Sequence, residues 1–343
     1  MARIKNIHLI GIGGCGVGAV GKILLEMGYK VSGSDLKENA NTIRLKEMGA
    51  HLFFGHEASN VREADIVVYS SAIAKDNPEM LEANARQIQI IPRAEMLSWI
   101  MSQSKVSIAI AGTHGKTTTT SMVSLVFDRT GQQPTFLIGG ENNDVGGNAR
   151  MGNGRYSIAE ADESDGSFLL LRPKTEVITN IEADHLDYYS GIDMIFKSFL
   201  DFADLLPDEG TLIVCSDSEN NRKLLLETGT GAKVITYGIE KEAQIMAKNI
   251  IPGEGSSKFE VFNKGRSLGE IKLNVPGRHN VENSLAAIAC GLSAGLDFLA
   301  ISSALRFFTG VKRRFQLIGK VMGVLIYDDY GHHPTEIEFT LRT

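Results

Sequence analysis

A short glycine-rich segment contains the residue types that hold nucleotide phosphates. Its members are Gly112, Thr113, His114, Gly115, Lys116, Thr117 and Thr118. An apolar run over residues 108–111 precedes it and a helical pattern follows it, which is the setting of a phosphate-binding loop. Backbone N–H groups would face the β- and γ-phosphates of ATP, Lys116 would neutralise their charge, and the Thr117 hydroxyl would coordinate Mg²⁺. Ile110 stands where the strict motif has its first glycine, so a merely tight turn is the alternative.

An acidic run follows another predicted strand, at residues 156–159. Four acids stand within the six residues 160–165: Glu160, Asp162, Glu163 and Asp165. Such a group repels itself unless it is solvated or bound to a metal ion. Because Glu160 closes an apolar strand, we expect it to be a Mg²⁺ ligand, whereas Glu163 and Asp165 fit a solvated loop.

His185 lies just beyond a third predicted strand, at residues 177–181. Open α/β sheets bind ligands at the carboxyl ends of their strands, so His185 falls at the expected edge. A lone histidine is more often structural or exposed. Its position beside two other phosphate-facing strand ends favours a functional role.

A second glycine-rich turn lies near the amino terminus and follows a predicted strand at residues 7–10. It contains Gly11, Gly13, Gly14, Gly16 and Gly18. Asp35 ends the next strand, as in dinucleotide-binding folds, and Ser70 and Ser71 close a later one. The pattern indicates that a diphosphate can approach the backbone here, while a close helix–strand contact is the alternative reason for the glycines.

Further polar residues gather towards the carboxyl terminus. Asn280 precedes an alanine-rich helix, where it could act as a cap, and Asn283 could pair with the edge of adenine. They are followed by Arg313, Arg314, Asp328, Asp329, Tyr330, His332 and His333. An arginine pair in a linker is usually solvated, but here it would lie within reach of a nucleotide bound between domains.

The elements that carry these residues alternate between apolar strands and amphipathic helices, which predicts parallel sheets in an α/β fold. The two glycine loops are about one domain length apart. We expect a Rossmann-like domain at residues 1–104, a P-loop ATP-binding α/β domain at 105–315, and the start of a third α/β domain at 316–343. Turn-rich segments near residues 253–257 and 263–266 predict a β-rich excursion before the helix near Asn280.

The last segment is predicted to hold one buried strand, at residues 321–327, and a helix that starts at Pro334 and runs to residue 341. These two elements cannot bury a core. We therefore expect the chain to stop inside its third domain, with roughly a hundred or more residues absent by the usual domain size.

Composition excludes several classes of protein. The formal net charge of -6 and a pI of about 5.8 provide no basic field for nucleic acid. Three cysteines, Cys15, Cys215 and Cys290, lack metal-type spacing and indicate a reducing compartment. Nothing resembles a signal peptide or a membrane span. We expect a cytoplasmic protein with no nucleic acid, membrane or obligate protein partner.

Taken together, seven motifs resemble the Mur ligases of peptidoglycan synthesis, in the right order along the whole chain. They are Gly-Ile-Gly-Gly, Gly-Thr-His-Gly-Lys-Thr-Thr, Glu-Ala-Asp-Glu-Ser-Asp, Asp-His-Leu-Asp, Gly-Arg-His-Asn, Arg-Arg-Phe-Gln and Asp-Asp-Tyr-Gly-His-His-Pro-Thr-Glu. The resemblance implies that the first glycine loop grips a UDP-sugar diphosphate rather than NAD. The substrates it implies are UDP-N-acetylmuramate and L-alanine, with ATP and Mg²⁺.

The resemblance also implies individual roles. Lys116 would hold the ATP phosphates, Thr117 and Glu160 one Mg²⁺, and His185 a second. Asn280 and Asn283 would contact adenine, Arg314 and Asp328 the phosphates and ribose, and Tyr330 and His332 the amino acid. The UDP-sugar set would be Gly11, Gly13, Gly14, Gly16, Asp35, Ser70 and Ser71. Lys197 does not fall at the spacing of the carbamylated lysine that some relatives carry.

The implied reaction forms an acyl phosphate from the lactyl carboxylate and ATP, which the alanine amine then opens. Three alternatives stay open. The related ligase that recycles a murein tripeptide uses the same sugar nucleotide, although Arg-Arg-Phe-Gln and Asp-Asp-Tyr-Gly favour alanine. An NAD-dependent oxidoreductase would use only the first loop, leaving Lys116, Glu160 and His185 unexplained. A truncated chain would bind substrates without ligating them.

Overall fold

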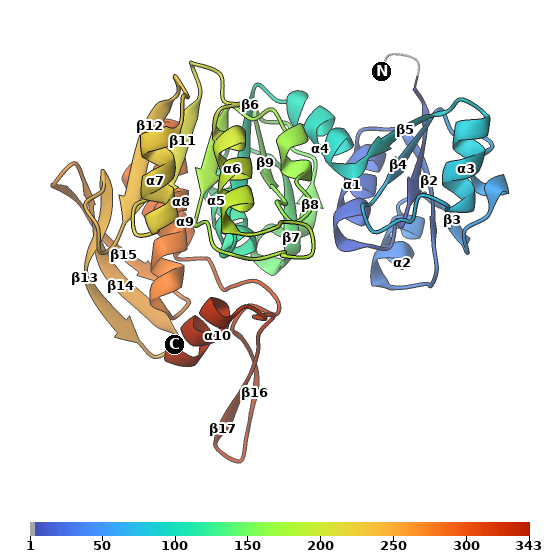
Figure 1. Ribbon diagram of the computed structural model, residues 1–343. Helices are drawn as coiled ribbons and strands as arrows, with labels where there is room; N and C mark the ends of the chain where they lie inside the picture. The colour runs from blue at the N-terminus through green and yellow to red at the C-terminus, as the bar shows by residue number, and fades with distance from the viewer. Residues whose placement is uncertain (1–3) are drawn as a thin grey trace.

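The computed structural model describes residues 4–343 and contains two parallel or largely parallel sheets with flanking helices, plus a projecting hairpin (Figure 1). The N-terminal sheet has the strand order β3-β2-β1-β4-β5, and all of its pairs are parallel. Its strands are β1 (Asn6–Ile10), β2 (Lys30–Asp35), β3 (His51–Phe54), β4 (Ile66–Tyr69) and β5 (Gln89–Pro92). The order reverses between β1 and β4, which is where such sheets bind ligands.

Helices α1 and α4 of this unit face the central sheet (Figure 1). The helices are α1 (Cys15–Glu26), α2 (Ala40–Glu47), α3 (Pro78–Ala85) and α4 (Arg93–Ser102), with a short 3-10 turn, η1 (Ala58–Val61). Gly18 brings α1 close to the turn that follows β1, because a Cβ on Gly18 would lie 2.9 Å from the Ile12 carbonyl oxygen. Close packing of the helix at the end of the strand therefore accounts for part of the glycine pattern.

The central sheet has ten strands in the order β15-β14-β13-β12-β11-β10-β6-β9-β7-β8. From β13 to β7 every pair is parallel, whereas β8 and the β13–β15 meander pair antiparallel. The strands are β6 (Val106–Ala111), β7 (Thr135–Asn142), β8 (Gly147–Arg150), β9 (Tyr156–Glu160), β10 (Thr175–Ile178), β11 (Thr211–Cys215), β12 (Lys233–Gly238), β13 (Ile245–Gly253), β14 (Ser256–Asn263) and β15 (Arg266–Leu273). The predicted β-rich excursion is confirmed.

Helices cover both faces of the central sheet. They are α5 (Lys116–Arg129), α6 (Ile192–Ala203), α7 (Glu219–Glu227), α8 (Arg278–Ser293) and α9 (Phe298–Leu305), with 3-10 turns η2 (Asn143–Val145) and η3 (Ser167–Leu170). Helices α5, α8 and α9 bury one core, and α6 and η3 bury the other. That second core continues into the N-terminal sheet, so the two sheets share apolar packing. No helix among residues 4–343 is long and apolar enough to cross a membrane.

A direct link between the two sheets runs through α1, which packs on β7 and β8. Lys22 Nζ donates to the Ala149 carbonyl at 2.6 Å. This docking holds the first glycine loop, which ends at the N-terminus of α1, next to the edge of the central sheet.

The C-terminal segment differs from the prediction of one buried strand at residues 321–327. The chain instead reverses at Met322 and Gly323, forming a hairpin of β16 (Gln316–Val321) and β17 (Val324–Asp328). Met322 has a φ of 50° and Gly323 a φ of 86°, as a tight turn requires. The apolar run at residues 321–327 predicts a single strand because the alternation of apolar side chains does not by itself reveal a turn. The hairpin projects from the body (Figure 1), and α10 (Pro334–Arg342), which was predicted, returns to it.

Candidate active site

The phosphate-binding loop between β6 and α5 needs glycine at both of its bends. Gly112 has a φ of 133° and Gly115 a φ of 81°. A Cβ on Gly112 would lie 2.0 Å from Thr179 Oγ1, and one on Gly115 would lie 2.6 Å from Asn283 Oδ1. The loop can therefore lie against its neighbours only because these two residues lack side chains.

Residues at the end of the adjacent strand β10 hold this loop in shape. Thr179 Oγ1 donates to the His114 carbonyl at 2.6 Å, and the His114 N–H donates to Asn180 Oδ1 at 2.8 Å. The Thr113 N–H donates to the Asn180 carbonyl at 3.0 Å. Strands β6 and β10 pair directly, so the fold itself brings these groups together.

Lys116 is paired with an acid that the sequence did not single out. Its Nζ lies 2.6 Å from Glu163 Oε1 and donates to the Gly112 carbonyl at 2.6 Å. Burial lowers the pKa of Lys116, but the Glu163 carboxylate outweighs burial and raises that pKa, so the lysine stays cationic. The expectation of a solvated Glu163 is wrong, because this residue is 2% exposed. The surrounding loop folds inwards, which spacing within an acidic run does not reveal.

Thr117 and Glu160, two predicted Mg²⁺ ligands, are brought together. Thr117 Oγ1 donates to Glu160 Oε1 at 3.1 Å, and the Gly139 N–H donates to Glu160 Oε2 at 2.8 Å. A hydroxyl and a carboxylate oxygen at this separation suit a hard cation such as Mg²⁺. The residues present therefore fit the ion.

His185, the third predicted ligand, lies by Glu163 rather than by Glu160. Its Nε2 is 3.9 Å from Glu163 Oε1 and 3.8 Å from Asp184 Oδ2. Its backbone has a φ of 49°, which is uncommon for a residue with a side chain and marks a constrained turn. His185, Glu163 and Lys116 thus form one group at the carboxyl edge of the sheet.

Helix α8 carries Asn280 and Asn283, the two residues predicted to contact adenine. It begins at Arg278 with Gly277 as its N-cap, so the expectation that Asn280 caps the helix is wrong. Asn280 Nδ2 donates to the Pro276 carbonyl at 2.7 Å instead. Asn283 Oδ1 accepts from Thr119 Oγ1 at 3.2 Å, which places its amide beside the phosphate loop.

Residues from the phosphate loop, from α8 and from the C-terminal segment line one cleft of about 920 Å³, whereas Lys116, Glu160, Glu163 and His185 are not in its lining. Its walls include His114, Gly115, Thr117, Thr118, Asn280, Asn283, Arg314, Asp329 and Glu336. Asp329 is one of the described residues that line the cleft, whereas Asp328, Tyr330 and His332 do not line it. Asp329 joins the two ends of the hairpin, because its Oδ2 accepts from the Phe315 N–H at 2.6 Å, and its Oδ1 accepts from the Gly331 N–H at 2.7 Å.

Arg314, Tyr330 and His332 lie together at the start of the C-terminal segment. The Arg314 guanidinium is 5.3 Å from the centre of the Tyr330 ring, and the Tyr330 and His332 rings are 5.4 Å apart. Arg314 also reaches Glu336 Oε1 at 3.6 Å. Glu336 lies within a motif of the sequence analysis but has no predicted role there, and in the structure it is one of the α10 residues that line the cleft.

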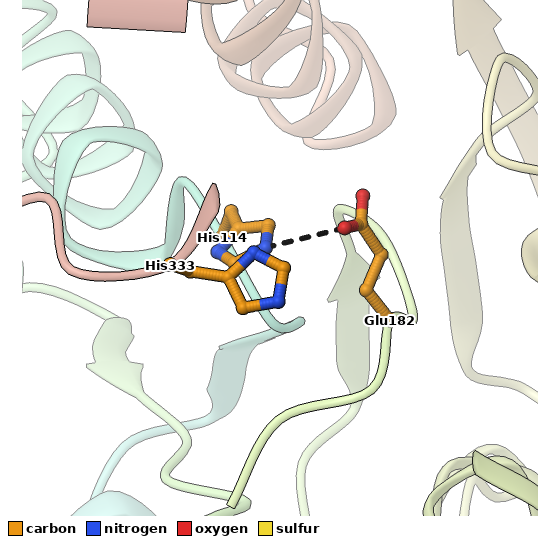
Figure 2. Close-up of side chains that lie close together, drawn as sticks. All are labelled: His114, Glu182 and His333. Carbon is orange, nitrogen blue, oxygen red and sulfur yellow. Dashed lines mark ion pairs between the residues drawn. The ribbon is translucent and has the colours of Figure 1, made fainter. Parts of the chain in front are cut away.

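His114 lies between two carboxylates. Its Nδ1 is 3.2 Å from Glu336 Oε1 and its Nε2 is 3.5 Å from Glu182 Oε2. Burial lowers the pKa of His114, but the neighbouring Glu182 and Glu336 carboxylates outweigh burial and raise that pKa to about 9. Figure 2 shows the Glu182 carboxylate directed at the His114 ring, with the His333 ring beside it.

The first glycine loop is organised by the residue that ends β2. The Gly13 N–H donates to Asp35 Oδ2 at 2.8 Å. A Cβ on Gly13 would lie 2.7 Å from that oxygen and 2.5 Å from Asn39 Nδ2. The predicted set of Gly11, Gly13, Gly14, Gly16, Asp35, Ser70 and Ser71 lies at the carboxyl edge of the N-terminal sheet.

Arg93 lies in none of the predicted motifs, and it connects the first glycine loop with the acidic loop. A Cβ on Gly16 would lie 3.1 Å from Arg93 Nη1, and Arg93 Nη2 pairs with Asp162 Oδ2 at 3.2 Å. Burial raises the pKa of Asp165, but hydrogen bonds from Ser167 and Ser71 outweigh it and lower that pKa. Arg93 and Ser71 of the N-terminal unit thus contact the acidic loop of the central unit at this point.

This fold and site define a class of ligase. The model of the Mur ligase family, catalytic domain, matches residues 6–105, and that of the Mur ligase middle domain matches residues 110–291. The chain belongs to the Mur ligase family. The family predicted from the motifs, and the Rossmann-like and P-loop α/β fold predicted with it, are confirmed.

Individual relatives make the comparison finer. The UDP-N-acetylmuramate–L-alanine ligase of Geotalea daltonii is 48% identical over 339 residues, covering 99% of this chain and 73% of that protein. The enzyme of the same name from Pelotomaculum thermopropionicum is 46% identical over 343 residues, covering 100% and 74%. The crystal structure of UDP-N-acetylmuramate-alanine ligase from Thermotoga maritima is similar, with a TM-score of 0.87 at 32% identity, covering 99% of this chain and 77% of that chain.

The steric role of Gly115 predicts a selective loss of nucleotide binding. In Gly115→Ala the new Cβ would meet Asn283 and the residue would keep a left-handed φ, so the loop must shift. We expect ATP affinity, measured by calorimetry, to fall by at least about tenfold, which is about 1.4 kcal/mol.

Gly131→Ala is the matched control at the other end of the same helix. Gly131 also has a left-handed φ, of 77°, but its Cβ would meet nothing within 4 Å. We expect a loss of about 1 kcal/mol in stability with ATP affinity unchanged. Equal effects of the two variants on ATP affinity would contradict the steric role.

His114 is expected to titrate near pH 9, as followed by NMR of its imidazole. Because its folded pKa lies above the ordinary value, its pairing stabilises the fold fully below about pH 6.5 and is lost as the pH rises through about 9. Glu336→Gln should lower the His114 pKa and reduce the thermal stability at pH 6 more than at pH 9.5.

Glu338→Gln provides the control for this titration, because Glu338 lies on α10 but pairs with Arg342 on the surface. It should leave the His114 pKa unchanged. An unaltered midpoint in Glu336→Gln would show that the carboxylate does not hold the proton on His114.

Proposed function

We propose that the protein is an ATP-dependent ligase that joins L-alanine to the lactyl carboxylate of UDP-N-acetylmuramate in peptidoglycan synthesis. One observation carries the proposal. Two separate phosphate-binding glycine loops lie on adjoining sheets, and Arg93 reaches from the first to Asp162 beside the second. A reaction between a sugar nucleotide and ATP needs two phosphate-binding sites that lie next to each other. The relatives named above act on the substrates that this proposal assigns.

The phosphate loop would bind and activate ATP. The N–H groups at the start of α5 face the β- and γ-phosphates, and Lys116 moves from Glu163 to neutralise the phosphate charge. Thr117 and Glu160 would hold Mg²⁺, with His185 at a second ion, and the ions supply charge compensation for crowded oxyanions. Asn280 and Asn283 would contact adenine, and Arg314 would reach the phosphates.

The chemistry proceeds in two steps. The lactyl carboxylate attacks the γ-phosphorus, and the bond to the β-γ bridging oxygen breaks to leave ADP and an acyl phosphate. The amine of alanine then attacks the acyl carbon, phosphate leaves, and the amine loses a proton. Preorganised charge lowers both barriers, because each transition state concentrates negative oxygens at one point. Tyr330 and His332 would face the amino acid.

The division of labour follows the sheets. We assign residues 1–104 to the UDP-sugar, with the diphosphate at Gly11, Gly13, Gly14 and Gly16 and further contacts from Asp35, Ser70 and Ser71. Residues 105–315 bind ATP, and residues 316–343 contribute to the amino-acid side. The change of sheet between α4 and β6 supports the first boundary.

A second candidate is the ligase that recycles murein peptides. The murein peptide ligase from Psychrobacter arcticus is similar in structure, with a TM-score of 0.85 at 27% identity, covering 98% of this chain and 75% of that chain. Both candidates share the sugar nucleotide and the ATP site. They differ only in the amine that opens the acyl phosphate.

The proposal is tested by measuring ligand binding and phosphate release with the full chain. We expect binding of UDP-N-acetylmuramate but not of NADH, and phosphate release that requires UDP-N-acetylmuramate, ATP and L-alanine together. Release that depends on the murein tripeptide instead of alanine would favour the second candidate. Binding of NADH, together with no binding of UDP-N-acetylmuramate, would contradict both candidates.

Lys116→Ala separates the two phosphate sites. Removing the cation should lower the rate of phosphoryl transfer by at least about 100-fold, because a charge stabilises the transition state most. UDP-N-acetylmuramate affinity should be unchanged, since that ligand meets the other glycine loop.

Arg129→Ala is the control, because Arg129 ends the same helix and its guanidinium lies over the exposed Phe307 ring. It should retain both activities. Loss of UDP-sugar binding in Lys116→Ala would contradict the assignment of two sites.

A further inference from the structure

Two histidines and a glutamate meet between the phosphate loop and the C-terminal segment. His114 lies in the β6–α5 loop, Glu182 follows β10, and His333 is the N-cap of α10. One potential ligand atom from each lies within 4.8 Å of the other two. Figure 2 shows the two rings side by side and the carboxylate directed towards them. Three segments that are distant in sequence thus place their donors at one point.

The two ring nitrogens of His114 have different surroundings. Its Nδ1 lies 3.2 Å from Glu336 Oε1, so a proton on Nδ1 is donated to that carboxylate. Among the described residues, His114 Nε2 makes no hydrogen bond and has the Glu182 carboxylate 3.5 Å away, although the residue is only 7% exposed. A buried imidazole nitrogen without a hydrogen bond needs a physical explanation. This nitrogen faces the point where Glu182 and His333 meet.

His333 is oriented in the same way. Its Nε2 lies 3.2 Å from the Ala183 carbonyl, which can only accept, so Nε2 carries the proton. Its Nδ1 therefore has the lone pair, and its one contact is the Thr335 N–H at 3.3 Å. Glu182 Oε2 is positioned by the Thr335 hydroxyl at 2.8 Å. Each of the three side chains thus has a second group that holds it in place.

We propose that His114, Glu182 and His333 form a site for a divalent transition-metal ion of the Zn²⁺ class. Two imidazole nitrogens and one carboxylate oxygen are a donor set that Zn²⁺ favours, with a fourth position left for water. A ligating histidine normally donates its other N–H to a carboxylate or a carbonyl, and both arrangements are present here. None of the three residues belongs to the Mg²⁺ set proposed above. The ion fastens α10 to the phosphate loop.

A second cluster, of Cys215, Asp217 and Glu282, satisfies the same distance criterion but suits a metal ion less well. Burial raises the pKa of the Cys215 thiol, so the thiolate that would bind metal is disfavoured. Both oxygens of Asp217 accept backbone N–H groups, including that of Ile239 at 2.7 Å. In the cluster at His114, the Thr335 N–H and hydroxyl are bonded to His333 Nδ1 and Glu182 Oε2, but His114 Nε2 makes no hydrogen bond to a described residue.

The test is a calorimetric Zn²⁺ titration of the chelator-treated full chain in excess Mg²⁺. We expect one tight equivalent in the wild type. His333→Asn should weaken it by more than about 100-fold, while asparagine keeps an acceptor for the N-cap of α10. Glu336→Gln, which removes only a positioning group, should weaken it by about 10–100-fold. Co²⁺ in place of Zn²⁺ should give the visible spectrum of a four-coordinate ion in the wild type but not in His333→Asn.

His185→Ala and Cys215→Ser are the controls for the other two candidate metal positions, and both should retain the tight equivalent. Matching thermal unfolding of all variants in chelator establishes that each is folded. The proposal is overturned if His333→Asn keeps wild-type Zn²⁺ affinity. It is equally overturned if His185→Ala or Cys215→Ser removes the tight equivalent.

Discussion

Lys116 and Glu163 form a largely buried ion pair where the phosphate loop meets the acidic loop, with the lysine side chain 15% exposed. Removing an isolated ammonium from water costs several kcal/mol, so a buried lysine needs an anion beside it. Glu163 provides one, and the Gly112 carbonyl accepts a second bond from the lysine. The cation is therefore in position before a nucleotide arrives, and an incoming phosphate has only to replace the carboxylate. The Gly112 bend and the acidic loop are both held by this lysine.

The parallel sheet explains why so many functional groups converge on this pair. Strands β6, β9 and β10 are neighbours, and all three run in the same direction. Their carboxyl ends carry the phosphate loop, the acidic loop and the segment with His185. Side chains that are tens of residues apart in sequence thus meet at one edge, where no ladder partner competes for them. Arg93 extends the same edge to the first glycine loop.

The C-terminal segment joins the site through charge rather than through apolar packing. Glu336 contacts both His114 and Arg314. Burial raises the pKa of Glu336, but the hydrogen bonds from His114 and the His332 N–H outweigh burial and lower that pKa to about 2. The hairpin before it leaves apolar side chains such as Leu317 and Val324 more than half exposed. The attachment of α10 to the phosphate loop is therefore an electrostatic contact. Such a contact responds to pH and to cations, which apolar packing does not.

The sequence by itself determined the two α/β units, the two glycine loops and the pairing of Thr117 with Glu160. Glycine, lysine and apolar alternation are local signals, because a left-handed bend or a buried strand constrains the residues that form it. Only the tertiary structure decided that Glu163 is buried and that Arg93 bridges the loops. It also placed Asp329 rather than Asp328 at the cleft, and made a hairpin of the expected single strand. These outcomes depend on how separate segments fold back on one another. The free energy of that packing comes from contacts between segments, so the local sequence of one segment does not determine it.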